Sequence, residues 1–221
     1  MTDRKNAKYA GVIFDLDGTL LDTLADLGDS VNAVLAEHGC PPRSYDEYKL
    51  IIGKGFRDLL TRSFPDGRSP AEIDAALAGF TAIYDRNYRR KTAPYPGIPE
   101  MLAALRDKRV ELGVNSNKRD DYSNNLIAAN FPDIPFVGVF GEREGVAKKP
   151  DPQSALQLAS LMSLAPERIL YVGDSKTDMQ TGRNAGMGTG GVLWGFRDAE
   201  ELRANGADHL FASAREITGL F

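Results

Sequence analysis

The sequence predicts an α/β protein, in which a doubly wound parallel sheet carries an all-helical segment inserted after its first strand. Three observations support this fold class. Apolar runs of strand length end in polar residues at 12–14, 112–114 and 169–172. Helical periodicity separates the later strands, and strands that alternate with helices are typical of parallel sheets. About 70 residues after the first run show helical periodicity and no confident strand pattern, which is enough for a small domain.

The composition is that of a globular protein with a substantial core. The chain has 221 residues, of which 42% are hydrophobic and 26% are charged. Its net charge of -4 comes without a clustered basic face, so we expect no nucleic-acid partner and no membrane partner. Cys40 is the only cysteine, which excludes an internal disulfide. The first eight residues are polar and no signal-like run follows them, so we expect a cytoplasmic location.

The first half of the chain divides into one strand and a set of helices. The apolar run at 9–14 predicts the first strand. Three-to-four spacing of apolar residues then predicts helices at 23–39, 44–52, 54–64 and 70–91. Two prolines and a glycine at 93–97 predict a stiff hinge. We therefore expect a core domain of residues 1–20 and 95–221, and a helical domain of residues 21–94.

The second half alternates between the two kinds of element. Helices are predicted at 98–108, 120–130, 152–163, 177–185 and 198–204. Strands are predicted at 110–114, 136–140, 168–172, 189–194 and 208–211. Because ligand sites in such sheets lie beyond the carboxyl ends of the strands, the polar residues that follow each apolar run are the candidate site.

Asp15 and Asp17 follow the first apolar run, and Gly18 and Thr19 turn the chain directly after them. Two carboxylates this close repel each other, so the pair calls for a cation. Oxygen ligands of this kind suit Mg²⁺. One carboxylate can then act as a nucleophile that carries a phosphoryl group, while the other moves a proton to or from the reacting oxygen.

Three later segments bring further polar residues to the ends of strands. Ser116 and Asn117 offer neutral groups that suit phosphate oxygens. Lys149 offers a positive charge against the phosphate and Asp15, and its neighbour Lys148 is expected to be solvated. Asp174 and Asp178 stand one helical turn apart near the start of a helix. Asp174 is expected to bind the metal directly, and Asp178 either binds it or accepts from metal-bound water.

Taken in order, these segments resemble the four motifs of the haloacid dehalogenase-like (HAD) phosphohydrolases. The first is Asp15-Leu16-Asp17-Gly18-Thr19, and the inserted helices resemble the helical cap of that family. The resemblance implies a Rossmann-like core and hydrolysis of phosphate monoesters through an aspartyl-phosphate on Asp15, with Asp17 as the acid and base. It also implies Mg²⁺ held by Asp15, Asp174 and the backbone carbonyl of Asp17, and phosphoryl oxygens held by Ser116, Asn117 and Lys149.

The substrate is expected to be a small phosphorylated metabolite chosen by the cap. Segments 95–97, 117–118, 149–152 and 192–196 look most like the phosphoglycolate phosphatase branch, which makes 2-phosphoglycolate the leading candidate. Lys54 and Arg57, beside flexible glycines, are candidates to meet a substrate carboxylate, or else are solvated charges. A β-phosphoglucomutase-like activity and a non-catalytic phosphate-binding or partner-binding role remain alternatives. The sequence indicates no oligomeric state.

Overall fold

A six-stranded parallel sheet in the order β5-β4-β1-β6-β7-β8 organises the computed structural model, which describes residues 8–65 and 67–221. Its strands are β1 (Gly11–Phe14), β4 (Glu111–Arg119), β5 (Phe136–Glu142), β6 (Ile169–Gly173), β7 (Gly188–Val192) and β8 (His209–Phe211). The central strand β1 pairs with β4 on one side and with β6 on the other. The three predicted strand ends that carry polar residues therefore lie side by side, and the predicted fold class is confirmed.

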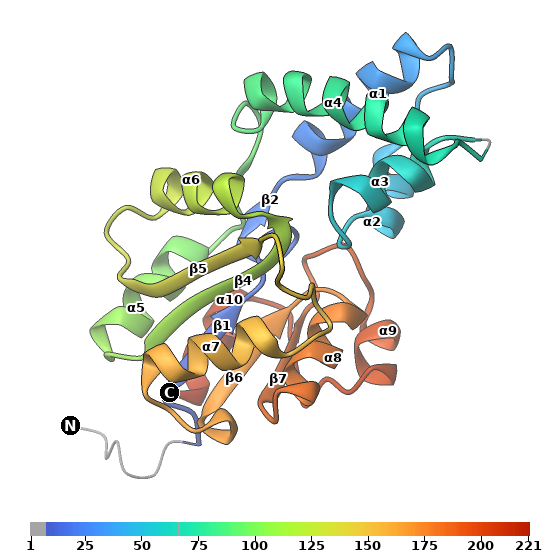
Figure 1. Cartoon of the computed structure of the whole chain (residues 1–221). Helices are drawn as coiled ribbons and strands as arrows, with labels where there is room; N and C mark the ends of the chain where they lie inside the picture. The colour runs from blue at the N-terminus through green and yellow to red at the C-terminus, as the bar shows by residue number, and fades with distance from the viewer. Residues whose placement is uncertain (1–7, 66) are drawn as a thin grey trace.

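Helices cover both faces of this sheet (Figure 1). One face carries α5 (Ile98–Asp107), α6 (Asp120–Asn130) and α10 (Ala214–Ile217), and the other carries α7 (Gln153–Met162) and α8 (Lys176–Asn184). Val12 and Phe14 pack on the first face and Ile13 packs on the second. This alternation explains why the whole β1 run is apolar, since neither face of the strand reaches water.

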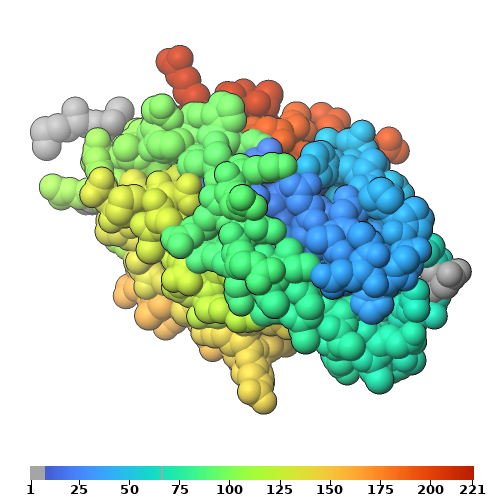
Figure 2. All heavy atoms as spheres, turned by 90° about the horizontal axis from the view of Figure 1, so that it is seen from above, coloured from blue at the N-terminus to red at the C-terminus, as the bar shows by residue number. Residues whose placement is uncertain are grey.

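Four helices lie in the described part of the inserted segment. They are α1 (Leu24–Glu37), α2 (Tyr45–Ile51), α3 (Phe56–Ser63) and α4 (Pro70–Asn87). Their apolar faces form a hydrophobic cluster that also takes in Tyr122 and Phe196 of the core. Figure 1 shows them beyond the sheet, and in Figure 2 their blue-to-teal atoms form one continuous mass beside the core. We refer to these helices as the cap.

Two of the cap helices begin at a capping box. Ser44 and Glu47 start α2, and Ser69 and Glu72 start α4, each pair satisfying two backbone N–H groups that a helix start leaves unpaired. Serine with glutamate three residues later is a sequence signal for a helix start, which is why the beginnings of these two helices could be predicted closely.

The two connections between the cap and the core pair with each other. β2 (Leu21–Asp22) runs antiparallel to β3 (Ala93–Pro94), in the segment predicted to be a stiff hinge. The buried carboxylate of Asp26 accepts hydrogen bonds from the backbone N–H groups of Lys91 and Thr92 and from the Thr92 hydroxyl. The division into residues 1–20 with 95–221 and residues 21–94 stays a prediction, and residues 1–7 lie outside the described part.

Some elements differ from the prediction. The strand expected at 110–114 continues to Arg119, because the polar residues 115–118 remain extended after the apolar run ends. The helix α9 (Ala199–Ala204) matches its prediction within a residue, whereas α10 was not predicted. Among the described residues, no helix combines the length and the apolar character that crossing a membrane requires.

Candidate active site

Asp15 lies at the end of β1, buried against the charged side chain of Lys149. The Nζ of Lys149 is 2.7 Å from the Oδ1 of Asp15 and 2.7 Å from the Oδ1 of Asp178. Burial, reinforced by the charge of Asp178, raises the pKa of Asp15 to about 7. Burial alone would lower the pKa of Lys149, but the charges of Asp15 and Asp178 raise it well above its ordinary value. Lys149 is therefore a charged ammonium group held directly against Asp15.

Asp174 follows β6, the neighbour of β1. One carboxylate oxygen from each of Asp15, Asp174 and Asp178 lies within 4.8 Å of the others, and all three residues are buried. Burial, together with the charges of Asp178 and Asp15, raises the pKa of Asp174 well above its ordinary value. Carboxylates forced together in this way are stabilised by a divalent cation, for which oxygen ligands are the natural set.

The positions of Asp174 and Asp178 depend on close approach by glycines. A Cβ on Gly18 would lie 2.3 Å from the Oδ2 of Asp174, and a Cβ on Gly195 would lie 2.3 Å from the Cβ of Asp174. A Cβ on Gly173 would lie 2.3 Å from the Cβ of Asp178. No side chain larger than hydrogen fits these three positions without displacing a carboxylate.

Hydrogen bonds distinguish the two later carboxylates. The Oδ2 of Asp174 accepts from the backbone N–H of Phe196 at 2.7 Å, and Phe196 also packs in the cap cluster. Asp178 accepts from Lys149 with one oxygen, and from the backbone N–H and hydroxyl of Ser175 with the other. Asp178 is thus the more fully engaged of the two, as expected for a residue that orients the site.

Asp17 makes an ion pair that the sequence did not predict. The Nζ of Lys118 lies 3.1 Å from its Oδ1 and 3.4 Å from its Oδ2. The Lys118 side chain is completely buried, whereas that of Asp17 is 13% exposed. The sequence pattern assigns Lys118 no role beyond its place in segment 117–118. One signal in the sequence points to Lys118. It stands two residues after Ser116, so both side chains lie on the same face if the strand continues.

The extended end of β4 sends its polar residues to opposite sides. Asn115 donates to the hydroxyl of Tyr171, and Asn117 donates to the backbone carbonyl oxygens of Lys149 and of Gly53 in the cap. The Asn117 amide oxygen also accepts from the Lys149 N–H. Ser116 lies on the opposite side, with its hydroxyl accepting from the Lys118 N–H. Asn117 therefore fixes the Lys149 backbone and joins the core to the cap.

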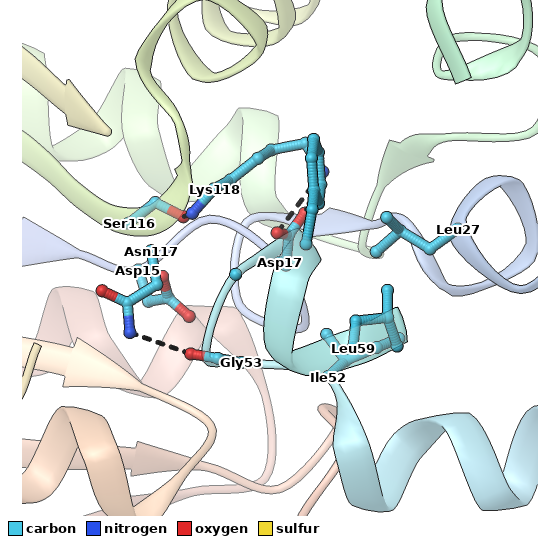
Figure 3. A pocket seen from close by; sticks show the side chains of 11 residues that line it. Asp15, Asp17, Leu27, Ile52, Gly53, Leu59, Ser116, Asn117 and Lys118 are labelled. Carbon is cyan, nitrogen blue, oxygen red and sulfur yellow. Dashed lines mark hydrogen bonds and ion pairs between the residues drawn. The ribbon is translucent and has the colours of Figure 1, made fainter. Parts of the chain in front are cut away.

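A small cavity of about 30 Å³ separates these core residues from the cap, space for about two water molecules. Figure 3 shows the side chains that line it, with Asp17 and Lys118 joined by one dashed line and Asn117 and Gly53 by another. The core side is charged and polar, and the cap side is apolar. The lining residues are Asp15, Asp17, Ser116, Asn117 and Lys118 from the core, and Leu27, Ile52, Gly53, Gly55, Phe56 and Leu59 from the cap.

The two predicted cap residues lie elsewhere. Arg57 pairs with Asp74 on the cap surface, and both side chains are more than half exposed. Lys54 lines a separate polar pocket together with Arg62 and Arg197, on the seam between the cap and the core. Neither side chain lines the cavity that holds Asp15.

Comparisons with known proteins agree with this geometry. The family model for haloacid dehalogenase-like hydrolases matches residues 12–192. The phosphoglycolate phosphatase of Caulobacter vibrioides is 34% identical over 94% of this chain and 89% of that protein. The N-acetylmuramic acid 6-phosphate phosphatase of Pseudomonas aeruginosa is 31% identical over 96% of this chain and 95% of that protein. A solved structure from Lactobacillus delbrueckii subsp. bulgaricus has a TM-score of 0.90 at 30% identity, covering 96% of this chain and 97% of that one. The chain belongs to the haloacid dehalogenase-like hydrolases.

Proposed function

We propose that this hydrolase is a Mg²⁺-dependent phosphatase of small phosphate monoesters, with 2-phosphoglycolate as its preferred substrate. The observation that carries the proposal is the burial of Asp15 between Lys149 and the carboxylates of Asp174 and Asp178, at the floor of a cavity closed by the cap. Relatives named as phosphoglycolate phosphatases, at about one third identity over most of the chain, support this substrate.

Asp15 is the proposed nucleophile. Its Oδ1 faces Lys149, and the described residues give its Oδ2 no hydrogen-bond partner, so this second oxygen is available for attack on phosphorus. Attack breaks the bond from phosphorus to the ester oxygen, and Asp17 gives a proton to the leaving alcohol. Water, deprotonated by Asp17, then attacks the phosphorus of the aspartyl-phosphate, releasing inorganic phosphate and restoring Asp15.

The residues present fit a divalent cation. With every group charged, four carboxylates and two lysines leave the site two excess negative charges. Burial, together with the charge of Asp178, raises the pKa values of Asp15 and Asp174, and a divalent cation would favour their charged forms. Asp15, Asp174 and the backbone carbonyl of Asp17 would hold the ion, with Asp178 as a further ligand or as an acceptor for its bound water. When bound, Mg²⁺ would neutralise charge on the phosphoryl oxygens.

The phosphoryl group would be held on the opposite side by Ser116 and Lys149. Ser116 lines the cavity, and Lys149 supplies the positive charge beside Asp15. The amide of Asn117 is engaged with Lys149 and Gly53, so its proposed contribution to phosphate binding is mainly to fix Lys149. Recognition of the substrate by Lys54 and Arg57 remains a prediction, and so does the cytoplasmic location.

The test is a screen of small phosphate esters with and without Mg²⁺, read by the release of inorganic phosphate. We expect turnover only with the metal, and the highest kcat/KM for 2-phosphoglycolate. Asp15→Asn is expected to abolish turnover of p-nitrophenyl phosphate while the protein remains folded, and Asp29→Asn on the cap surface is the matched control. Activity retained by Asp15→Asn would end its assignment as the nucleophile. Isomerisation of glucose 1-phosphate without phosphate release would instead indicate a mutase.

A further inference from the structure

We propose that Lys118 is the specificity residue of this site, and that its ammonium group binds a carboxylate carried by the leaving alcohol of the substrate. This inference rests on the proposed phosphatase function and names the group that selects the substrate. It places recognition of the carboxylate on the core strand β4, in addition to the cap residues Lys54 and Arg57 that the sequence predicts.

The first argument is burial. The Lys118 side chain has no exposed surface, and among the described residues Asp17 is the anion that its Nζ contacts. A buried ammonium is costly unless each of its three hydrogens meets an acceptor. The only acceptors found for it in residues 8–65 and 67–221 are the two oxygens of Asp17, at 3.1 and 3.4 Å. Lys118 therefore has capacity for a further anionic partner.

The second argument is the position of Lys118 in the cavity. Of the residues that line the cavity, all of them within the described part, Lys118 is the one cation. Its Nζ lies 5.5 Å from the ring centre of Phe56 and 5.0 Å from that of Tyr84, both on the cap. Closure of the cap thus surrounds this ammonium with aromatic rings, and a low-dielectric wall strengthens its attraction for an anion.

The third argument follows from the proposed reaction. Asp17 must contact the leaving oxygen in order to protonate it, and Lys118 lies at hydrogen-bond distance from Asp17. Groups within a few bonds of the leaving oxygen are then next to the Lys118 ammonium. In 2-phosphoglycolate one methylene separates that oxygen from the carboxylate. Lys149 is already held between Asp15 and Asp178, beside the proposed nucleophile. Lys149 would therefore bind the phosphoryl group of the substrate, and Lys118 would bind its carboxylate.

Matched pairs of esters test this role. One pair is 2-phosphoglycolate and 2-hydroxyethyl phosphate, and the other is 2-phospholactate and 1-hydroxypropan-2-yl phosphate, so each pair exchanges a carboxylate for a neutral hydroxymethyl group. We expect wild-type kcat/KM to favour the carboxylate by about ten- to a hundredfold, the usual range for a charge-assisted contact. Lys118→Met should reduce this ratio at least tenfold. Lys118→Arg should keep most of it, and Lys49→Met, which removes an exposed cap lysine, should leave it unchanged.

The outcomes separate the proposals. If wild type shows no preference within either pair, or if Lys118→Met lowers both members of each pair equally, Lys118 only positions Asp17 and the inference is overturned. If another carboxylated ester is better than 2-phosphoglycolate but the preference still depends on Lys118, the substrate assignment fails and the inference stands. Circular dichroism checks the fold of each variant. Lys118→Gln, which keeps a donor for Asp17, replaces Lys118→Met if the latter does not fold.

Discussion

Gly195 offers a test of how the proposed metal site is held in place. The change is Gly195→Ala, which adds one methyl group outside the proposed catalytic residues. The new Cβ would lie 2.3 Å from the Cβ of Asp174 and 2.4 Å from the backbone oxygen of Gly18. Carbon atoms in proteins pack at about 3.5–4.0 Å, so Asp174 or the Gly18 turn must move by about 1 Å.

A shift of that size is large for Asp174 as a proposed metal ligand. Removing the groups that orient such ligands typically costs about 10–100-fold in metal affinity or activity. Overpacking of this kind also costs about 1–3 kcal/mol in the free energy of unfolding. We therefore expect Gly195→Ala to raise the Mg²⁺ concentration for half-maximal activity by about 10–100-fold.

The assay is a Mg²⁺ titration of p-nitrophenyl phosphate hydrolysis, with metal binding measured separately by calorimetry. Gly219→Ala is the matched control, because a Cβ at Gly219 meets nothing within 4 Å. Wild-type Mg²⁺ affinity in a folded Gly195→Ala protein would refute the argument that close approach of Gly195 sets the position of Asp174. Destabilisation with unchanged affinity would place the shift in Gly18 instead.

Two further predictions concern the hinge and the metal. Asp26→Asn replaces an acceptor of two backbone N–H groups and a hydroxyl, so we expect chemical denaturation to show a loss of about 2–3 kcal/mol, whereas Asp29→Asn, an exposed partner of Lys91, should lose under about 1 kcal/mol. Equal losses would contradict this account of the hinge. In metal-free protein the pKa of Asp15 is raised to about 7, so protons compete with the cation below that pH. Because the pKa of Asp174 is raised as well, calorimetry should show Mg²⁺ affinity falling at least about tenfold from pH 8 to pH 6, and a pH-independent affinity would contradict this.

Much of the fold could be predicted because its signals are local. The β1 run is apolar throughout, since helices cover both faces of the strand, and the capping residues Ser44 and Ser69 mark two helix starts. The pairing of β2 with β3 could not be predicted, because Leu21 and Pro94 are distant in sequence and each strand has two residues. The end of β4 was placed too early because the apolar pattern stops at Val114, while the backbone remains extended.

In the site, too, residues marked by a local sequence pattern could be predicted, whereas contacts between distant segments could not. Asp15, Asp174 and Lys149 each follow a recognisable strand or precede a recognisable helix, and the structure brings them together. The partners of Asp17 and Asn117 depend on strand register and on cap closure, which no local pattern encodes. The role of Lys118 therefore cannot be predicted from the sequence, although its ammonium contacts the proposed general acid.

The cap and the chemistry are linked through groups that serve both. Asn117 binds the Lys149 backbone and the cap carbonyl of Gly53, while Phe196 binds Asp174 through its N–H and packs its ring among the cap helices. Lys118 contacts Asp17 and lies against two cap aromatic rings. Each of these groups would lose a cap partner if the cap opened. The contacts with the cap therefore stabilise the same arrangement that positions Asp15, Asp174 and Asp17, which would couple enclosure of a substrate to assembly of the proposed site.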